Sequence, residues 1–210
     1  MGTKEVQSYK EKAYDIIKKK IIYCELAPGD VVDKKELIDE LGIGRTPIRE
    51  ALSNLEQENL VVIMPRRGVV VSSISINDLS QIYAVREIVE PAMVKLAMPN
   101  LNDEDLQRFA EQFKSYDDLG VLDQTKLDSQ FHQFLAKMTH NNYIIKLMDN
   151  LHSQNQRIRI MTSNVPDRMR HSTTEHLNII EKLIARDVDG AEDLMRHHIS
   201  ISKKTASTIL

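Results

Sequence analysis

The sequence predicts a mainly helical protein in two parts, an N-terminal winged helix-turn-helix and a C-terminal antiparallel bundle of six helices. Two observations predict the first part: a glycine turn separates two apolar helical patterns, and two short β-branched runs joined by a basic turn follow them. The second part is predicted because the chain beyond residue 77 consists of helical patterns separated by short polar breaks. We therefore expect domains at 1–73 and 78–210, joined by a polar linker at 74–77.

The two helices of the first part have recognisable start and stop signals. Asp33 can cap the first helix, because its carboxylate can accept hydrogen bonds from the free N–H groups of the first turn. Gly42 can supply the left-handed residue that ends this helix, and Pro47 suits the first turn of the next one, where its missing N–H costs nothing. Apolar residues three to four apart predict the buried stripe of that second helix: Ile48, Leu52 and Leu55.

A hairpin is expected directly after these helices. Leu60 to Met64 and Val69 to Ser72 are short β-branched runs, and Pro65 to Gly68 form the turn between them. The turn carries Arg66 and Arg67, so the hairpin would be a basic wing.

The second helix begins with the side chains that a recognition helix needs. Arg45 and Arg49 are four residues apart and share one face, and Thr46 lies beside them in the first turn. Cationic and hydroxyl side chains at this place meet base edges and phosphates in the major groove of DNA. A solvated helix face is the alternative for two arginines, and an ordinary charged turn is the alternative for Arg66 and Arg67. The combination of capped helix, glycine turn, arginine-led helix and basic hairpin favours DNA binding.

Composition narrows the class of protein. The chain has 210 residues and a net charge of −3, and its first 75 residues hold as many acidic as basic side chains. DNA binding would therefore depend on clustered cations and not on a general positive charge; the candidates are Lys10, Lys34, Lys35, Arg45, Arg49, Arg66 and Arg67. A single cysteine excludes an intramolecular disulfide. Neither a secretory signal nor an apolar run of 18 residues occurs, so we expect a cytoplasmic protein without a membrane segment.

Helical patterns fill the second part. Ser75 and Asp78 form a capping-box pattern, Pro91 predicts a kink in the first helix, and Gly120 is expected to end the second. The expected helices cover about 79–98, 103–119, 122–138, 143–161, 166–186 and 188–201.

Four side chains of this bundle form a candidate metal site. Asp128 and His132 are four residues apart on the third helix, and a short turn would bring His176 and His198 of the last two helices to similar heights. Three imidazoles and one carboxylate suit a divalent first-row metal and leave positions open for water or a ligand. Helical histidines on the surface or in the core are the alternative, and spacing alone does not decide between the two.

The N-terminal part resembles the DNA-binding domain of the GntR family of bacterial transcription regulators over residues 8–72. The resemblance rests on Pro28-Gly29, Leu37, Leu41-Gly42-Ile43, Arg45-Thr46-Pro47-Ile48-Arg49-Glu50-Ala51-Leu52, Leu55, Leu60-Val61 and Arg67-Gly68-Val69. Gly44 and Asn59 depart from the family pattern, which has serine and glycine there. The resemblance implies that the arginines, the threonine and the wing glycine approach the operator. The complete candidate set is Lys35, Arg45, Thr46, Pro47, Arg49, Arg67 and Gly68.

The C-terminal part resembles the effector-binding domain of the FadR subfamily in its six-helix FCD form. The matching residues are Arg86 with Glu90, Asp128 to His132, Glu175-His176, Ala191 to Met195 and His198-Ile199. The resemblance implies that Asp128, His132, His176 and His198 bind zinc or nickel, with His198 preferred to its neighbour His197. It also implies a carboxylate-type effector near the metal, with Arg86 as its cationic partner. A helix pair between Arg86 and Glu90 is the alternative role for that arginine.

Together these patterns predict a transcription regulator, a repressor whose affinity for DNA is controlled by a small organic acid. We expect a homodimer on a palindromic operator, because one winged helix buries too little surface to specify a site in a genome. A regulator that senses the metal itself is one alternative. A metal-dependent hydrolase is another, although the sequence offers no separate nucleophile or general base and that function would not explain the winged helix.

Overall fold

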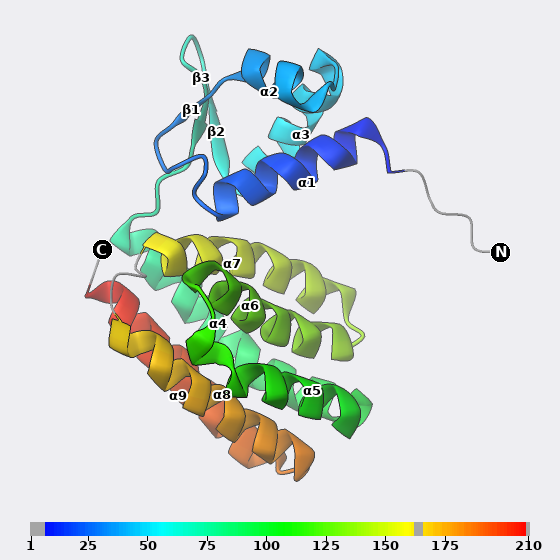
Figure 1. Ribbon diagram of the computed structural model, residues 1–210, viewed down its shortest axis with the longest axis vertical. Coiled ribbons are helices and arrows are strands. Elements are labelled where there is room, and N and C mark those ends of the chain that lie inside the picture. Colours follow the sequence, from blue (N-terminus) through cyan, green and yellow to red (C-terminus); the bar gives the residue numbers. More distant parts are fainter. Residues whose placement is uncertain (1–6, 162–165, 209–210) are drawn as a thin grey trace, which may run out of the picture. The chain divides into compact units, whose positions relative to one another are not determined.

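The computed structural model describes residues 7–161 and 166–208 and divides the chain into two compact units, on either side of the Ile74–Ser75 bond. Each unit is described by itself. The N-terminal unit has the elements expected of a winged helix-turn-helix (Figure 1). These are α1 (Tyr9–Ile22), β1 (Val31–Val32), α2 (Lys34–Leu41), α3 (Arg45–Gln57), β2 (Val61–Met64) and β3 (Gly68–Val71).

The local signals for α2 and α3 act as predicted. The carboxylate of Asp33 accepts hydrogen bonds from the backbone N–H groups of Lys35 and Glu36. Gly42 ends α2 in the left-handed conformation, with φ of 61°, and turns the chain into α3. The core of this unit is the apolar stripe of α3 packed against the buried side of α1 and against the strands.

The sheet has one strand more than the sequence predicted. β3 pairs antiparallel with β2, as expected for the wing, and also with β1, which gives the order β1-β3-β2. β1 has only two residues, and Val31 lies opposite Val70. Such a short strand leaves no alternating pattern in the sequence; its pairing with a distant strand defines it.

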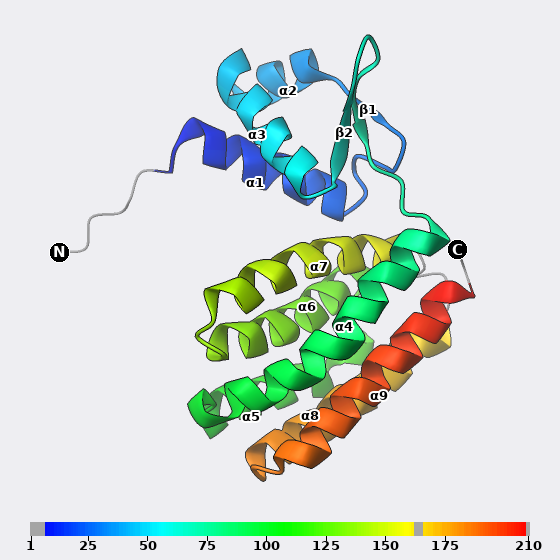
Figure 2. The same cartoon turned by 180° about the vertical axis from the view of Figure 1, so that it is seen from behind.

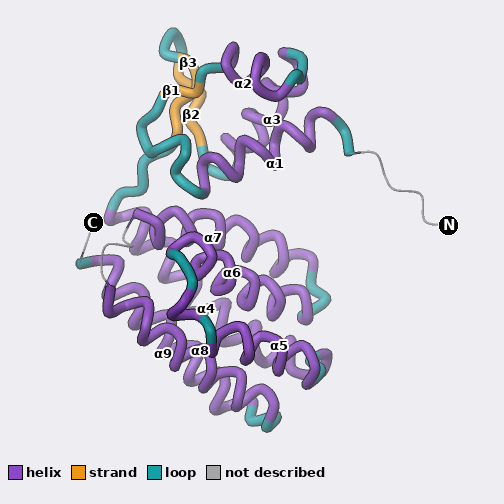
Figure 3. Tube along the Cα trace, viewed as in Figure 1, coloured by secondary structure: helices purple, strands orange, loops and turns teal. Residues whose placement is uncertain are grey.

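The C-terminal unit is a bundle of six α-helices within the described residues (Figures 1 and 3). In Figure 2, α4 and α9 lie side by side, and α6 lies next to α7. The helices are α4 (Ile76–Ala97), α5 (Asp103–Lys114), α6 (Val121–Met138), α7 (Asn142–Met161), α8 (Pro166–Ile184) and α9 (Val188–Ser207). None of the helices described is long and apolar enough to cross a membrane.

Several predicted boundaries were wrong. α4 begins at Ile76, inside the expected linker, because the capping box of Ser75 and Asp78 starts the helix directly after Ser75. α5 ends at Lys114 and a short 3-10 helix follows, so Gly120 precedes α6 as its N-cap and does not end α5. α9 continues to Ser207. α4 continues past Pro91 to Ala97, which agrees with the expectation that this helix runs through the proline.

Candidate DNA-binding and metal-binding sites

One exposed face of the N-terminal unit gathers the predicted DNA-binding cations. Arg45 and Thr46 form the first turn of α3, Arg49 follows one turn later, and all three are exposed. Together with α2 they form a groove of about 590 Å³. Its lining residues are Lys34, Lys35, Ile38, Asp39, Arg45, Thr46, Ile48 and Arg49. Pro47 is half-buried in the same turn.

These cations differ from Lys18 of α1 in whether a carboxylate pairs with them. Among the described residues, no ion pair involves Arg45, Arg49 or Arg67. Lys18, by contrast, lies 2.6 Å from the carboxylate of Glu58 and is largely withdrawn from solvent. Because carboxylates do not already balance their charges, the arginines of α3 and of the wing are free to contact phosphates.

The wing turn has a backbone that favours glycine. Gly68 has φ of +87°, a region that L side chains rarely adopt, and Arg66 before it also has a positive φ of 66°. Arg66 and Arg67 are exposed at this tip. The turn therefore presents two guanidinium groups on a tight, defined loop.

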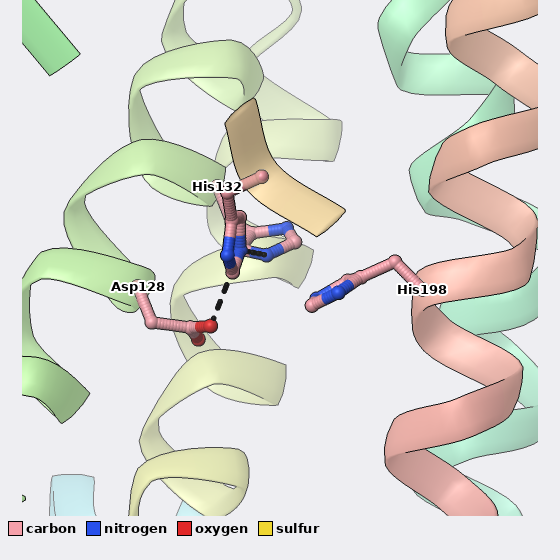
Figure 4. Close-up of side chains that lie close together, drawn as sticks. Asp128, His132 and His198 are labelled. Atoms are coloured by element: carbon pink, nitrogen blue, oxygen red, sulfur yellow. Dashed lines mark hydrogen bonds and ion pairs between the residues drawn. The ribbon is translucent and has the colours of Figure 1, made fainter. Parts of the chain in front are cut away.

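In the C-terminal unit the four predicted metal ligands converge. Asp128 and His132 project from α6 toward His198 of α9 (Figure 4). With His176 of α8, each offers a donor atom, and these atoms all lie within 4.8 Å of one another. His176 Nε2 lies 3.3 Å from His132 Nε2 and 3.3 Å from Asp128 Oδ1. All four side chains are buried, whereas His197 is exposed and takes no part in the group.

Nδ1 of His176 and Nδ1 of His198 are each hydrogen-bonded to a neighbouring oxygen, whereas Nδ1 of His132 is close to a carboxylate oxygen without forming a hydrogen bond. His176 Nδ1 lies 2.7 Å from the carbonyl oxygen of Ser172, and His198 Nδ1 lies 2.6 Å from the carboxylate of Glu175. His132 Nδ1 lies 2.5 Å from Glu90 Oε2. When Nδ1 carries the proton, the lone pair is on Nε2, which is the arrangement found around metal-binding histidines.

The protonation states of Asp128 and His176 also suit the binding of a metal cation. Burial opposes ionisation of Asp128, but Arg159 and the nearby histidines hold the pKa of this carboxyl below its ordinary value. Burial lowers the pKa of His176 to about 3, so its imidazole is neutral and can donate a lone pair. Arg159 donates a hydrogen bond of 2.9 Å to Asp128 Oδ1 and another to the hydroxyl of Tyr116.

Arg86 is part of a buried pair next to this group. Its Nε lies 2.5 Å from Glu90 Oε1, and its Nη1 donates to the side-chain oxygen of Asn155. Burial opposes ionisation of Glu90, but Arg86 and His132 keep the pKa of this carboxyl below its ordinary value. The helix pair considered for Arg86 is therefore present, and its Nη2 still has no hydrogen-bond partner in the described structure.

Three further residues surround the site and were not predicted from the sequence as part of it: His152, Arg159 and Glu175. His152, Asn155 and Arg159 are spaced by three and four residues on α7, so their shared face was visible as a pattern. What the sequence did not show is that this face of α7 packs toward α6 and α4.

Comparisons with known proteins agree with both halves of this description. Residues 9–71 match the bacterial regulatory proteins of the gntR family, and residues 81–200 match the FCD domain. The HTH-type transcriptional repressor RspR of Escherichia coli K12 is 27% identical over 202 residues, which cover 92% of this chain and 86% of the relative.

Solved structures confirm the predicted fold class. E. coli McbR/YncC aligns with a TM-score of 0.81 at 21% identity, over 95% of this chain and 99% of that one. A GntR transcriptional regulator from Rhodococcus sp. RHA1 aligns with a TM-score of 0.82 at 22% identity, over 97% of this chain and 100% of that one. Both alignments extend over nearly the whole of this chain, so they include the winged helix and the helical bundle.

Proposed function

This chain belongs to the GntR family of bacterial regulatory proteins, with an FCD domain at its C-terminal end, and we propose that it is a repressor controlled by a small carboxylate. The families that match its two parts, and the relatives that match nearly its whole length, are transcription regulators and not enzymes. The hydrolase alternative is therefore withdrawn. A repressor is proposed because RspR bears that description.

Operator binding is assigned to α3 and the wing. The support is the exposed row of Arg45, Thr46 and Arg49 beside Lys35, and the basic wing tip at Arg67 and Gly68. In this arrangement α3 enters the major groove and the wing lies along the backbone. Because the unit carries no net charge, most of the affinity would come from these few contacts.

The metal is assigned to Asp128, His132, His176 and His198. These residues fit a divalent ion such as zinc or nickel, because their donor atoms converge and two of the histidines have their Nδ1 hydrogen-bonded elsewhere. When bound, the ion supplies a positive charge that attracts an anion. The convergence of these four buried donors is the observation that carries the proposal.

The effector is proposed to be a small organic acid held between the metal site and Arg86. Arg86 Nη2 is a buried, charged donor without a hydrogen-bond partner in the described part of the chain, so an anion that reached it would satisfy it. A regulator that senses only the metal would not need an unpaired arginine donor beside the metal site. The presence of Arg86 Nη2 therefore favours an organic ligand over the metal as the signal.

The test is a double substitution, His176→Ala with His198→Ala, compared with metal-loaded and metal-stripped wild-type protein. We expect the variant to lose the metal, to melt at a lower temperature, and to bind operator DNA without responding to small carboxylates. The exposed His197→Ala is the matched control and should keep both the metal and the response. Unchanged metal content in the double variant, measured by elemental analysis, would place the metal elsewhere. If metal alone, added to metal-stripped wild type, changed operator binding as fully as a carboxylate does, the metal sensor would be favoured.

A further inference from the structure

The tip of the wing holds an arginine in a backbone conformation that favours glycine. The turn between β2 and β3 forms the free end of the hairpin (Figure 1). The backbone N–H of Arg67 donates to the carbonyl oxygen of Met64 over 3.3 Å, so Pro65 and Arg66 are the central residues of a β-turn. Arg66 has φ of 66°, and a positive φ at the second central position, after proline, identifies a type II turn. Glycine or asparagine is the usual residue at that position.

The folded unit does not use the charge of Arg66. The side chain is exposed, and among the described residues it takes part in no hydrogen bond or ion pair. An L side chain in the left-handed region is strained, and such strain persists where the residue serves a function. The neighbouring Arg67 also has no ion pair in the described structure, but its φ is not positive. Only Arg66 therefore needs a reason for being retained at an unfavourable position.

DNA offers two partners for a cation at this tip. With α3 in the major groove, as proposed, a hairpin of the same unit meets the adjacent phosphate strand or the minor groove beyond it. A phosphate on the surface of the duplex can be met by a cation on an unstrained residue of the hairpin. The minor groove is only about 6 Å wide, so it admits the apex of a tight turn with a flat guanidinium group, but not the broader strands.

The chemistry of the tip suits the minor groove. Residues 61–71 contain no carboxylate, and their only charged groups are the two arginines of the turn. Arginine is more weakly hydrated than lysine, so it loses less on entering a narrow groove. The groove is narrow, and its negative potential is enhanced, over runs of A·T pairs, whereas guanine places an amino group in it. A guanidinium in this groove would therefore favour A·T-rich over G·C-rich DNA.

We propose that Arg66 inserts its guanidinium into the minor groove beside the sequence that α3 reads, and so makes the operator A·T-rich at that place. Arg67 stays on the adjacent phosphates. The inference rests on the proposed function, since it adds a specificity-determining residue to the same DNA-binding face. It concerns base pairs other than those that α3 contacts, so its effect can be separated from that of Arg45 and Arg49.

The test needs duplexes that differ in the minor groove alone. Wild-type protein first selects tight binders from a library of random duplexes, and A·T-rich positions should flank the selected half-sites. The selected sequence is then made with A·T, G·C or inosine·C pairs at those positions. Inosine lacks the amino group that guanine places in the minor groove and presents the same groups as guanine in the major groove. Selected sequences without A·T-rich flanks would contradict the proposal.

Gel shifts at fixed salt compare the three duplexes. Wild type should bind the A·T and inosine·C duplexes about 10-fold tighter than the G·C duplex, as expected for one or two unfavourable base pairs. Arg66→Gly should reduce that ratio to about 1, and Arg66→Lys, which keeps the charge, should retain only part of it. Arg67→Gly is the matched control. It should weaken binding to all three duplexes by a similar factor and leave the ratio unchanged.

Stability gives a second measurement on the same pair of variants. Glycine relieves the strain at residue 66, so the denaturant midpoint of Arg66→Gly should be at or above that of the wild type. Arg67→Gly has no such strain to relieve and adds freedom to the unfolded chain, so its midpoint should be lower. A clearly lower midpoint for Arg66→Gly would show that the arginine supports the turn, and the proposal would fail.

The remaining outcomes separate this inference from the proposed function. If Arg66→Gly weakens binding to the three duplexes equally, Arg66 is a phosphate contact and the minor-groove assignment fails. If the inosine·C duplex behaves like the G·C duplex with wild type, the A·T preference is read in the major groove, and the inference fails as well. In both cases operator binding by α3 stands. If wild type selects no sequence from the library, operator binding itself fails and the inference falls with it.

Discussion

At the residue scale, a hydrogen bond at Nδ1 of a proposed metal-site histidine leaves the lone pair of its Nε2 available to a metal ion. His176 and His198 come from different helices, yet each has its Nδ1 fixed by an oxygen within 2.7 Å. In this way Ser172 and Glu175, neither of them a proposed ligand, set the tautomer and the ring orientation at the centre. The contribution of such neighbours can be measured separately from that of the ligands.

Glu175→Gln should weaken metal binding without abolishing it. An amide oxygen still accepts the hydrogen bond of His198, but it no longer supports the ring with a negative charge, and changes of this kind cost about 10- to 100-fold in metal affinity. Competition with a chromophoric chelator would measure the change. Glu181→Gln, an exposed carboxylate of α8, is the control. Equal affinity of Glu175→Gln and wild type would contradict the role given to Glu175.

Arg45→Ala and Arg49→Ala should each lower operator affinity by about 10- to 100-fold and leave the helical content unchanged. Both side chains are exposed and, among the described residues, form no ion pair, so their removal costs the fold little. A gel shift at fixed salt is the measurement, with exposed Arg108→Ala of α5 as the control for the change in charge. Wild-type affinity in both variants would rule out α3 as the recognition helix.

At the scale of elements, the turn between α2 and α3 determines how the proposed recognition helix α3 is oriented relative to α2. Gly42 ends α2 at φ of 61°, and no atom lies within 4 Å of the position that a Cβ would take. The constraint on residue 42 is therefore the backbone conformation alone and not a lack of space.

Gly42→Ala should destabilise the N-terminal unit by about 1–2 kcal/mol, the cost of placing a Cβ in the left-handed region. Gly42→Asn is the matched control, because asparagine adopts the left-handed conformation more readily than alanine. Denaturant unfolding would measure both. A loss for Gly42→Ala no larger than that for Gly42→Asn would show that the turn is not held in this conformation.

At the scale of the whole molecule, two units divide the proposed work: one carries the DNA-binding face, the other the metal and effector site. A signal in the second unit must alter operator binding by the first. A two-fold dimer provides a means, because a change in the spacing of two DNA-binding units alters how well both fit a palindrome at once.

The protein should therefore be a homodimer at micromolar concentration. Light scattering would measure its mass, and a gel shift would compare a full palindrome with one half-site. Binding to the full palindrome should be much tighter, because two-fold symmetry doubles the contacts. A monomer that binds one half-site as tightly as the palindrome would contradict this prediction.

The sequence by itself determined the features that depend on neighbours three or four residues apart. The cap at Asp33, the left-handed Gly42, the capping box of Ser75 and the apolar stripe of α3 are all local, and all are present in the structure. The same spacing placed Asp128 and His132 on one face of α6. Family resemblance, not spacing, singled out His198 in place of His197.

Only the tertiary structure decided what depends on distant segments meeting. β1 exists because Val31 and Val32 pair with β3, nearly forty residues later. The pair of Arg86 with Glu90 could have been solvated; packing of α4 against α6 and α7 buries it. The same packing brings His152 and Arg159 beside the metal ligands. Local sequence patterns fix which side of a helix is polar, but the free energy of burying that side depends on the helix it meets.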